Sequence, residues 1–347
     1  MPIQDRIIDW FPDYYMINLD DLPSTINWPI LTIHSEVGLY EANRIRKRPL
    51  EQIHLWLKGL IEKSDKEKII FCKKGELFSY YEFERILFKL EKDFPSKTLI
   101  SFFNDYRELD TKFLCIPWLG FWEDVWAHNS GHHESFRSMS NSHQRKKLFL
   151  NKNNKPKNHR VNWVEFLEKH NLKNKGYVSE VWNGVYIEND NELPDNILYS
   201  NNEINYDWSY SDDWKLINYY NNVFCEIALE SEYNDPVFGC WHSPKSWPQF
   251  MMCLIPMIIG FKNWDDYLRD AGFDMFDDVI DTSFYKTDDL NRKFSIIKSN
   301  LKIIENDLTV DGKFRDDIWD RLKRNQSHFL DLENYKKYLY KKLFLID

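Results

Sequence analysis

A lysine stands in an unusual place in the stretch HSPKSW, at residues 242–247. If Ser243 caps a helix whose first residue is Pro244, then Lys245 is the second helical residue. A positive charge at this position opposes the positive end of the helix dipole by up to about 1 kcal/mol. A bound anion would reverse that penalty, because the dipole and the ammonium would then both attract it. The plainer alternative is a lysine that extends into solvent.

Polar residues also follow two of the apolar, strand-like runs. The run VFCEIALES ends in Glu230 and Ser231, and KKLFLN ends in Asn151. A carboxylate at a strand end suits a sugar hydroxyl. Asn151, together with Arg160 at the start of the next helical pattern, could hold an anion between backbone donors and a guanidinium. A solvated basic turn and a local cap made by Glu230 remain the alternatives.

Candidate general bases occur in the first half of the chain. His34 and Glu36 end the apolar run INWPILTIHSE, where a parallel sheet would place them at an active-site cleft. Glu123 and the histidines of 128–133 are weaker candidates. The acidic run 273–293 lacks EF-hand spacing and the histidines lack HExxH spacing, so we expect no metal site.

The elements that carry these residues are predicted by apolar runs that alternate between strand and helix spacing. Before residue 140, apolar runs predict strands over 26–36, 68–73 and 97–103, with helices over 49–63 and 77–94. The later runs that share this alternation predict strands over 146–151, 176–181, 223–231 and 255–260, helices over 161–172, 244–254 and 263–271, and closing helices over 290–305, 313–324 and 332–345. Such alternation is typical of α/β folds with parallel sheets.

The pattern divides the chain into two Rossmann-like domains facing a cleft. We expect an N-terminal α/β domain over 1–140, a second α/β domain over 141–310 and C-terminal helices over 311–347 that pack back on the core. The boundary near 140 coincides with the basic, acid-free segment 138–160. Ligands of such folds bind at the carboxyl ends of the strands.

The composition narrows the class of protein. The chain has 347 residues, is 43% hydrophobic and carries a net charge of −9, which argues against a surface coated for non-specific DNA binding. The five cysteines show no CxxC spacing, so we interpret them as reduced packing residues. No signal pattern and no 18-residue apolar run is present, which predicts a cytoplasmic protein without a membrane span.

The second half resembles a known family. The succession KLFLNKNNKPKNHRVNWVEFLEKHNLKNKGYVS, EIALESE, HSPKSW, IPMIIGF and DTSF, over about 145–300, is similar to glycosyltransferase-like proteins of phages, marine microbes and giant viruses. Their carboxyl half is similar to the donor domain of GT-B enzymes such as the α1,3-fucosyltransferases. The resemblance implies a GT-B fold, in which 1–140 is the acceptor-side domain and 141–310 is the nucleotide-sugar donor domain. If the protein is viral, it also implies the host cytoplasm as its location.

The resemblance assigns roles to individual residues. Lys245 matches a lysine that binds the donor diphosphate, Arg160 matches a phosphate-binding arginine, and Glu230 with Ser231 matches a position near the nucleotide. Asn151 and Ser243 complete the expected nucleotide-binding set. Two departures are visible: Pro244 replaces a ribose-binding glutamate, and Tyr285 replaces the second acid of a motif that keeps Asp281 and Ser283.

The implied activity is glycosyl transfer from a UDP- or GDP-linked sugar to a glycan or a modified nucleobase, with no metal or other cofactor. GT-B enzymes stabilise the departing diphosphate with basic side chains and helix N-termini. A base from the first domain, Glu36 or His34, would activate the acceptor hydroxyl. The alternatives are a non-catalytic carbohydrate- or protein-binding module on a decayed transferase fold and a DNA-base-modifying transferase.

Overall fold

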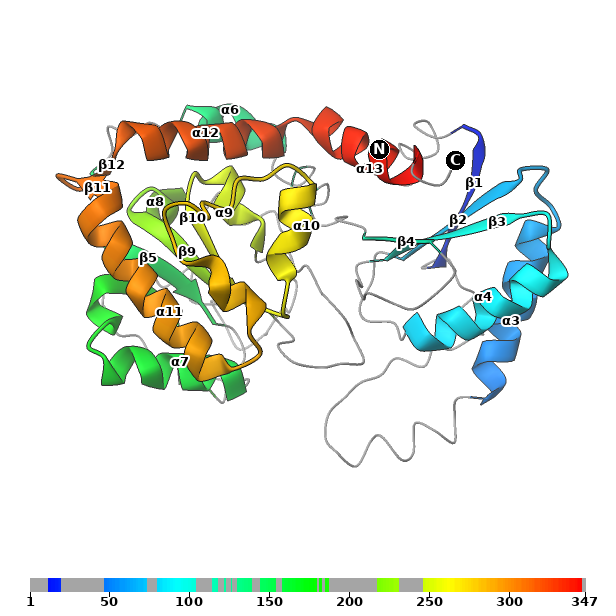
Figure 1. Ribbon diagram of the computed structural model, residues 1–347, viewed down its shortest axis with the longest axis horizontal. Helices are drawn as coiled ribbons and strands as arrows, with labels where there is room; N and C mark the ends of the chain where they lie inside the picture. Colours follow the sequence, from blue (N-terminus) through cyan, green and yellow to red (C-terminus); the bar gives the residue numbers. More distant parts are fainter. Residues whose placement is uncertain are drawn as a thin grey trace. The chain divides into compact units, whose positions relative to one another are not determined.

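The computed structural model describes residues 12–19, 47–73, 80–103, 114–117, 122, 126, 130–138, 144–153, 158–179, 181–182, 185–186, 217–230 and 246–344. Parallel strands alternate with helices through most of this part, so the chain is an α/β protein (Figure 1). Contacts group the chain into two compact units: the first contains Met1–Gly120 with Asp235–Trp241 and Tyr340–Asp347, and the second contains Phe121–Asn234 and His242–Leu339. The predicted boundaries at 140 and 310 and the GT-B arrangement stay predictions.

The first unit contains a four-stranded parallel sheet in the order β1-β2-β3-β4. Its elements in chain order are β1 (Tyr14–Asn18), α3 (Lys47–Ile61), β2 (Lys68–Lys73), α4 (Tyr80–Asp93), β3 (Thr98–Phe103) and β4 (Leu114–Pro117). The predicted helices over 49–63 and 77–94 and the strands over 68–73 and 97–103 are confirmed. The predicted strand over 26–36 lies outside the described residues, and β1 was not predicted.

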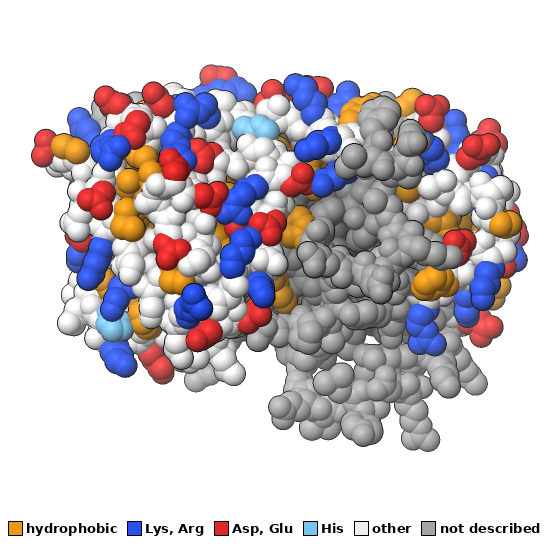
Figure 2. Space-filling model, in the orientation of Figure 1, with side chains coloured by type: hydrophobic (Ala, Val, Ile, Leu, Met, Phe, Trp, Pro, Cys, Tyr) orange, Lys and Arg blue, Asp and Glu red, His pale blue; other side chains and the backbone are white. Residues whose placement is uncertain are grey.

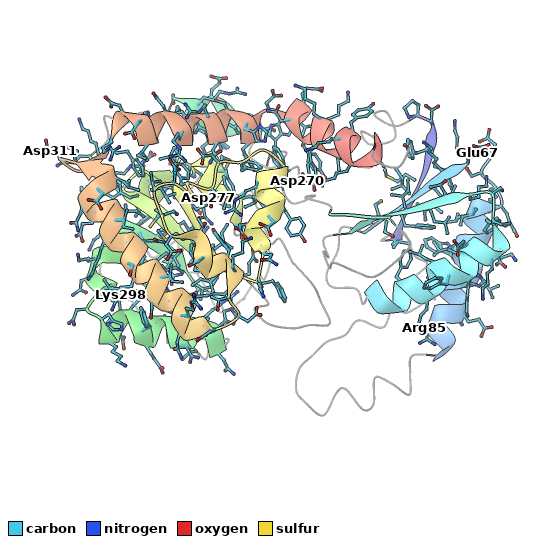
Figure 3. The ribbon with its side chains drawn as sticks, in the orientation of Figure 1. Glu67, Arg85, Asp270, Asp277, Lys298 and Asp311 are labelled. Atoms are coloured by element: carbon cyan, nitrogen blue, oxygen red, sulfur yellow. The ribbon has the colours of Figure 1, made fainter. Side chains whose placement is uncertain are left out.

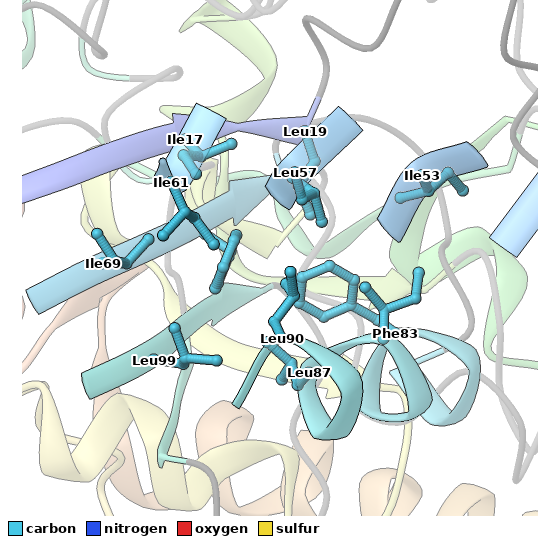
Figure 4. Close-up of a cluster of buried hydrophobic side chains, with 12 residues drawn as sticks. Ile17, Leu19, Ile53, Leu57, Ile61, Ile69, Phe83, Leu87, Leu90 and Leu99 are labelled. Carbon is cyan, nitrogen blue, oxygen red and sulfur yellow. The ribbon is translucent and has the colours of Figure 1, made fainter. Parts of the chain in front are cut away.

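An apolar core joins this sheet to α3 and α4 (Figure 4). Ile69 and Phe71 of β2 point to the helices, and the ring of Phe71 meets the ring of Phe83 edge-on at 5.4 Å between centroids. Ile70 and Ile100 alternate with them, point to the opposite face and are also fully buried. Strands buried on both faces are typical of parallel sheets.

The second unit contains another four-stranded parallel sheet, in the order β10-β9-β5-β6. Its strands are β5 (Lys147–Lys152), β6 (Gly176–Ser179), β9 (Val223–Leu229) and β10 (Ile255–Ile259). All four were predicted from their apolar runs. The chain enters the sheet at β5, adds β6 on one side and then crosses to β9 on the other side. This order is Rossmann-like, and the direction of winding reverses between β5 and β9.

The other described elements after residue 121 are helices and short strand pairs. They are α6 (His133–Arg137), α7 (Asn158–Lys169), α8 (Ile217–Tyr220), α9 (Pro248–Met251), α10 (Trp264–Asp270), α11 (Leu290–Ile303), α12 (Asp316–Leu330) and α13 (Leu332–Phe344), with 3-10 turns η2 (Ser130–His132), η3 (Lys173–Lys175) and η6 (Thr282–Lys286), a π-turn η7 (Ile304–Leu308), and the antiparallel pairs β7 (Val181–Trp182) with β8 (Val185–Tyr186) and β11 (Thr309–Val310) with β12 (Lys313–Phe314).

Two contacts show how the helices cover the second sheet. α7 lies beside α11, where the rings of Trp163 and Phe294 meet edge-on at 4.9 Å between centroids. α12 lies beside α6 and α9, because the buried Gln326 amide donates to the carbonyls of Phe136 and Met251 at 2.6 and 2.8 Å. β9 and β10 are buried along their whole length.

Two predicted helix starts in the second unit are wrong. The helix predicted from Pro244 begins at Pro248 with Trp247 at its N-cap, because a second proline also suits the first helical position. It ends after one turn, where Cys253 adopts a left-handed backbone with φ of 54°. The helix predicted from residue 313 begins at Asp316, because β12 pairs with β11 across an Asp311–Gly312 turn.

Charged side chains of both signs are interspersed on the face of the second unit shown in Figure 2. In the described part of the chain, no helix is long and apolar enough to cross a membrane. Cys72, Cys225 and Cys253 are buried, and burial raises the pKa of the Cys253 thiol to about 12.

Candidate functional site

The candidate site is the carboxyl edge of the second sheet, at the point where its winding reverses. Asn153 follows β5, Glu230 follows β9 and Gly260 follows β10. The strand register sets Glu230 beside Gly260, because Leu229 pairs with Ile259 and the Glu230 amide donates to the Ile259 carbonyl at 2.9 Å. Ligands of open α/β sheets bind outside this edge, next to the reversal.

The first turn of α7 holds the end of β9. Arg160 is 1% exposed, and its Nη2 donates to the carbonyls of Leu229 and Glu230, both at 3.2 Å. The His159 ring lies with Nε2 at 2.9 Å from the same Glu230 carbonyl, which fixes Nε2 as the protonated nitrogen. The sequence separates Arg160 from Glu230 by 70 positions, and the fold brings them into contact.

The Glu230 side chain is buried between two neighbours. Its carboxylate accepts a hydrogen bond from the Ser246 hydroxyl, and both residues are fully buried. Its stem lies against Gly260, where a Cβ would come within 3.2 Å of Glu230 Cγ and 3.1 Å of Trp264 Cδ1. Glycine therefore leaves the space that the glutamate occupies. In this geometry Glu230 holds the segment that begins at Ser246.

A second buried cation binds the neighbouring strand end. Lys293 of α11 is fully buried, and its Nζ donates to the Gly260 carbonyl at 2.7 Å. Arg160 and Lys293 thus bind the carbonyls of adjacent residues, Glu230 and Gly260, that follow adjacent strands. Chemically, this arrangement fixes both strand ends and adds positive charge to the edge at which ligands of such folds bind.

Two further polar groups tie β5 to β9. The Asn151 amide is buried and donates to the Ile227 carbonyl at 2.6 Å, while its oxygen accepts from Asn153 at 2.6 Å. Lys152 Nζ lies 3.2 Å from a carboxylate oxygen of Glu226, a residue buried within β9. Asn151, Arg160 and Glu230 therefore gather at one edge, and their described contacts are with protein atoms. Their roles as nucleotide ligands stay predictions.

The acidic segment after α10 is used for structure. Asp277, labelled in Figure 3, accepts from Arg269, and Asp278 accepts from Arg321 at 2.7 Å. The Arg269 guanidinium lowers the pKa of the Asp277 carboxyl below its ordinary value. Asp281 and Asp289 accept from the backbone amides that begin η6 and α11. Each of these four carboxylates has a protein donor.

Tyr285, which replaces an acid of the resembling family, is a buried structural residue. Its hydroxyl donates to the Pro256 carbonyl and accepts from the Ile258 amide, both at 3.3 Å within β10. Burial raises its pKa well above the ordinary value, so the hydroxyl stays protonated. An acid here would place a carboxylate against buried backbone.

Several predicted site residues lie outside the described part of the chain. They are His34, Glu36, Ser231, Ser243 and Lys245. Because α9 begins at Pro248, Ser243 does not cap it, and the dipole argument for Lys245 at this helix is wrong. Among the residues that the structure describes, no group of three His, Cys, Asp or Glu side chains could hold a metal ion. His133 is buried against Trp126 and bonded to its carbonyl at 3.1 Å.

Sequence reasoning missed four residues of this edge: His159, Ser246, Gly260 and Lys293. His159 and Ser246 are direct neighbours of the predicted Arg160 and Lys245, so a wider window would have included them. Lys293 lies in an amphipathic helix and carries no motif. Only the fold reveals that it binds Gly260.

Comparison with protein families, curated proteins and solved structures finds no match to this chain.

Proposed function

We propose that the chain is a glycosyltransferase whose nucleotide-sugar donor binds at the carboxyl edge of β5, β9 and β10. One observation carries the proposal: Arg160 and Glu230, which the resemblance assigns to one nucleotide site, are in contact at the reversal point of a Rossmann-like sheet. The donor is a UDP- or GDP-linked sugar, and the acceptor is a hydroxyl of a glycan or of a modified nucleobase.

The charge of the edge supports a diphosphate ligand. Arg160 and Lys293 bring two cations to the ends of β9 and β10, and Lys245 adds a third immediately before Ser246 in the sequence. Positive charge near a departing diphosphate lowers the barrier to glycosyl transfer, since negative charge grows on the leaving oxygen. A base in the first unit, Glu36 or His34, would take the proton of the acceptor hydroxyl.

The burial of the same residues favours a second candidate from another class. Arg160 is 1% exposed and Glu230 is fully buried, and both bind protein atoms, as residues of a rigid scaffold do. A carbohydrate- or protein-binding module on a transferase fold would keep such a scaffold without turning over a donor.

Calorimetric titration with UDP-, GDP- and CMP-sugars tests the proposal. We expect one nucleotide to bind and Lys245→Ala to weaken it by about tenfold, the effect of one charge-assisted hydrogen bond. Lys313→Ala is the matched control. This exposed lysine lies on β12, and the turn before β12 accepts a hydrogen bond from the Arg145 amide, at the amino end of β5 and not at its carboxyl end. Absence of binding to all three, or equal binding by wild type and Lys245→Ala, contradicts the proposal.

An assay for released nucleoside diphosphate separates the two candidates. A transferase releases the diphosphate slowly to water even without its acceptor. Binding without any release, in the presence of glycan and DNA acceptors, would favour the binding module.

A further inference from the structure

Lys293 is the one buried lysine among the described residues, and helix periodicity alone does not explain it. On α11 it is adjacent to a stripe of apolar residues, Phe294, Ile297 and Leu301, that are at most 1% exposed. A methionine would fit such a position without the cost of removing an ammonium from water. A buried cation at a sheet edge where ligands bind is therefore a candidate for a functional role.

The contact that Lys293 makes leads to Glu230. Its ammonium donates to the Gly260 carbonyl at 2.7 Å, which fixes the turn after β10. Gly260 in turn packs directly against the aliphatic part of the Glu230 side chain, since a Cβ at Gly260 would lie 3.2 Å from Glu230 Cγ. The Glu230 carboxylate then accepts from the Ser246 hydroxyl. A shift of Gly260 must move Glu230, Ser246 or both.

The Glu230 backbone and side chain are held by different groups. Arg160 and His159 bind the Glu230 carbonyl, and the Glu230 amide donates to the Ile259 carbonyl. The Glu230 side chain meets Gly260 along its stem and Ser246 at its carboxylate. The turn that Lys293 holds is therefore in direct contact with the Glu230 side chain.

We propose that Lys293 is a positioning residue for the ligand site, acting through Gly260 to set the Glu230–Ser246 pair. This inference rests on the proposed function, because the ligand is the nucleoside diphosphate part of the donor. Lys293 acts from the Gly260 carbonyl, by keeping the start of the segment at Ser246 in the conformation that binds the diphosphate.

A double-mutant cycle on nucleotide affinity tests the inference. We expect Lys293→Met to weaken UDP or GDP binding by about tenfold, and Ser246→Ala to weaken it by a similar factor. If both act through the same pair, the double variant should bind about as weakly as each single variant. A purely structural role of Lys293 predicts that the two factors multiply, to about a hundredfold.

Two controls keep the result interpretable. Lys302→Met removes an exposed lysine from the same helix and should leave affinity unchanged. Gly260→Ala displaces Glu230 without deleting a charge, so it should weaken binding even if Lys293→Met does not fold. This inference alone is overturned if Lys293→Met or Gly260→Ala binds the nucleotide with wild-type affinity. It is also overturned if the affinity losses of the two single variants multiply in the double variant. No binding by the wild-type chain overturns the proposed function as well.

Discussion

In the first unit, the buried side chains of β2, β3, α3 and α4 are apolar except for Ser101, among the residues described there. In the second unit, charged or amide side chains are buried near the strand ends, including Asn151, Arg160, Glu230 and Lys293. Both sheets are parallel and buried, so the difference does not come from fold class. Buried polar groups cost free energy unless they are bonded, and these four lie at one edge of one sheet. The comparison locates the candidate site in the second unit and leaves the first as an apolar scaffold in its described part.

The largest effect that sharpens this comparison is expected in the first unit. Phe71→Ala should lower the free energy of unfolding by about 4 kcal/mol, because it removes a buried ring that packs on Phe83. Urea unfolding followed by circular dichroism measures the loss. Phe88→Ala on α4, where the ring is 39% exposed, is the control and should cost less than about 1 kcal/mol. Equal losses from the two variants would contradict an apolar core around Phe71.

The next effect concerns the buried ion pair of the second unit. Glu226→Leu should destabilise the protein by about 3 kcal/mol, because it leaves the Lys152 ammonium without the carboxylate 3.2 Å away. The double variant Lys152→Met with Glu226→Leu should recover to within about 1 kcal/mol of wild type, since two apolar groups replace two charges. Urea midpoints of the three proteins decide this. If the double variant is less stable than Glu226→Leu, the buried Lys152–Glu226 pair is a net source of stability, and the prediction is wrong.

A smaller, pH-dependent effect is expected from buried histidines of the second unit. Burial lowers the pKa of His328 below its ordinary value of 6.5, although its ring bonds the Ala271 carbonyl at 2.7 Å. Below pH 6.5 the unfolded chain therefore binds more protons than the folded chain, so stability falls as the pH drops. The slope from one histidine is at most about 1.4 kcal/mol per pH unit.

Unfolding in urea at pH 7.5, 6.5 and 5.5 measures this slope. His328→Gln keeps an N–H for the Ala271 carbonyl and should flatten the curve below pH 6.5. An unchanged slope in His328→Gln would assign the acid sensitivity to other groups, such as His133, whose pKa burial also lowers.

The smallest effect is expected at the surface. Lys175 and Glu305 form an ion pair at 2.6 Å with both side chains 44% exposed. Glu305→Gln should change the free energy of unfolding by less than about 1 kcal/mol, because solvent screens the pair. A larger loss in a urea titration would mean that exposed charges also hold the second unit together.

Much of the fold follows from hydrophobic periodicity. The apolar runs that form β2, β3, β5, β6, β9 and β10 are short and contain β-branched or aromatic residues, so they predict strands correctly. The start of α9 does not follow, because Pro244 and Pro248 both satisfy the rule for a first helical residue. The hairpin at Asp311–Gly312 has a local sequence signal, since Asp-Gly favours such turns.

The site was predictable only in part. Asn151, Arg160 and Glu230 follow strands or begin a helix, so a parallel sheet alone brings them to one edge. Their burial and their protein partners depend on side-chain packing, which periodicity does not report. Lys293 and Gly260 come together from elements 33 positions apart, and no local pattern marks the pair.

A crystal of the chain soaked with UDP and GDP tests the central claim most directly. The account predicts diphosphate density at the carboxyl edge of β5 and β9, next to Arg160 and the segment that begins at Ser246. Density only elsewhere on the chain, or no density at concentrations that saturate binding in solution, would contradict it.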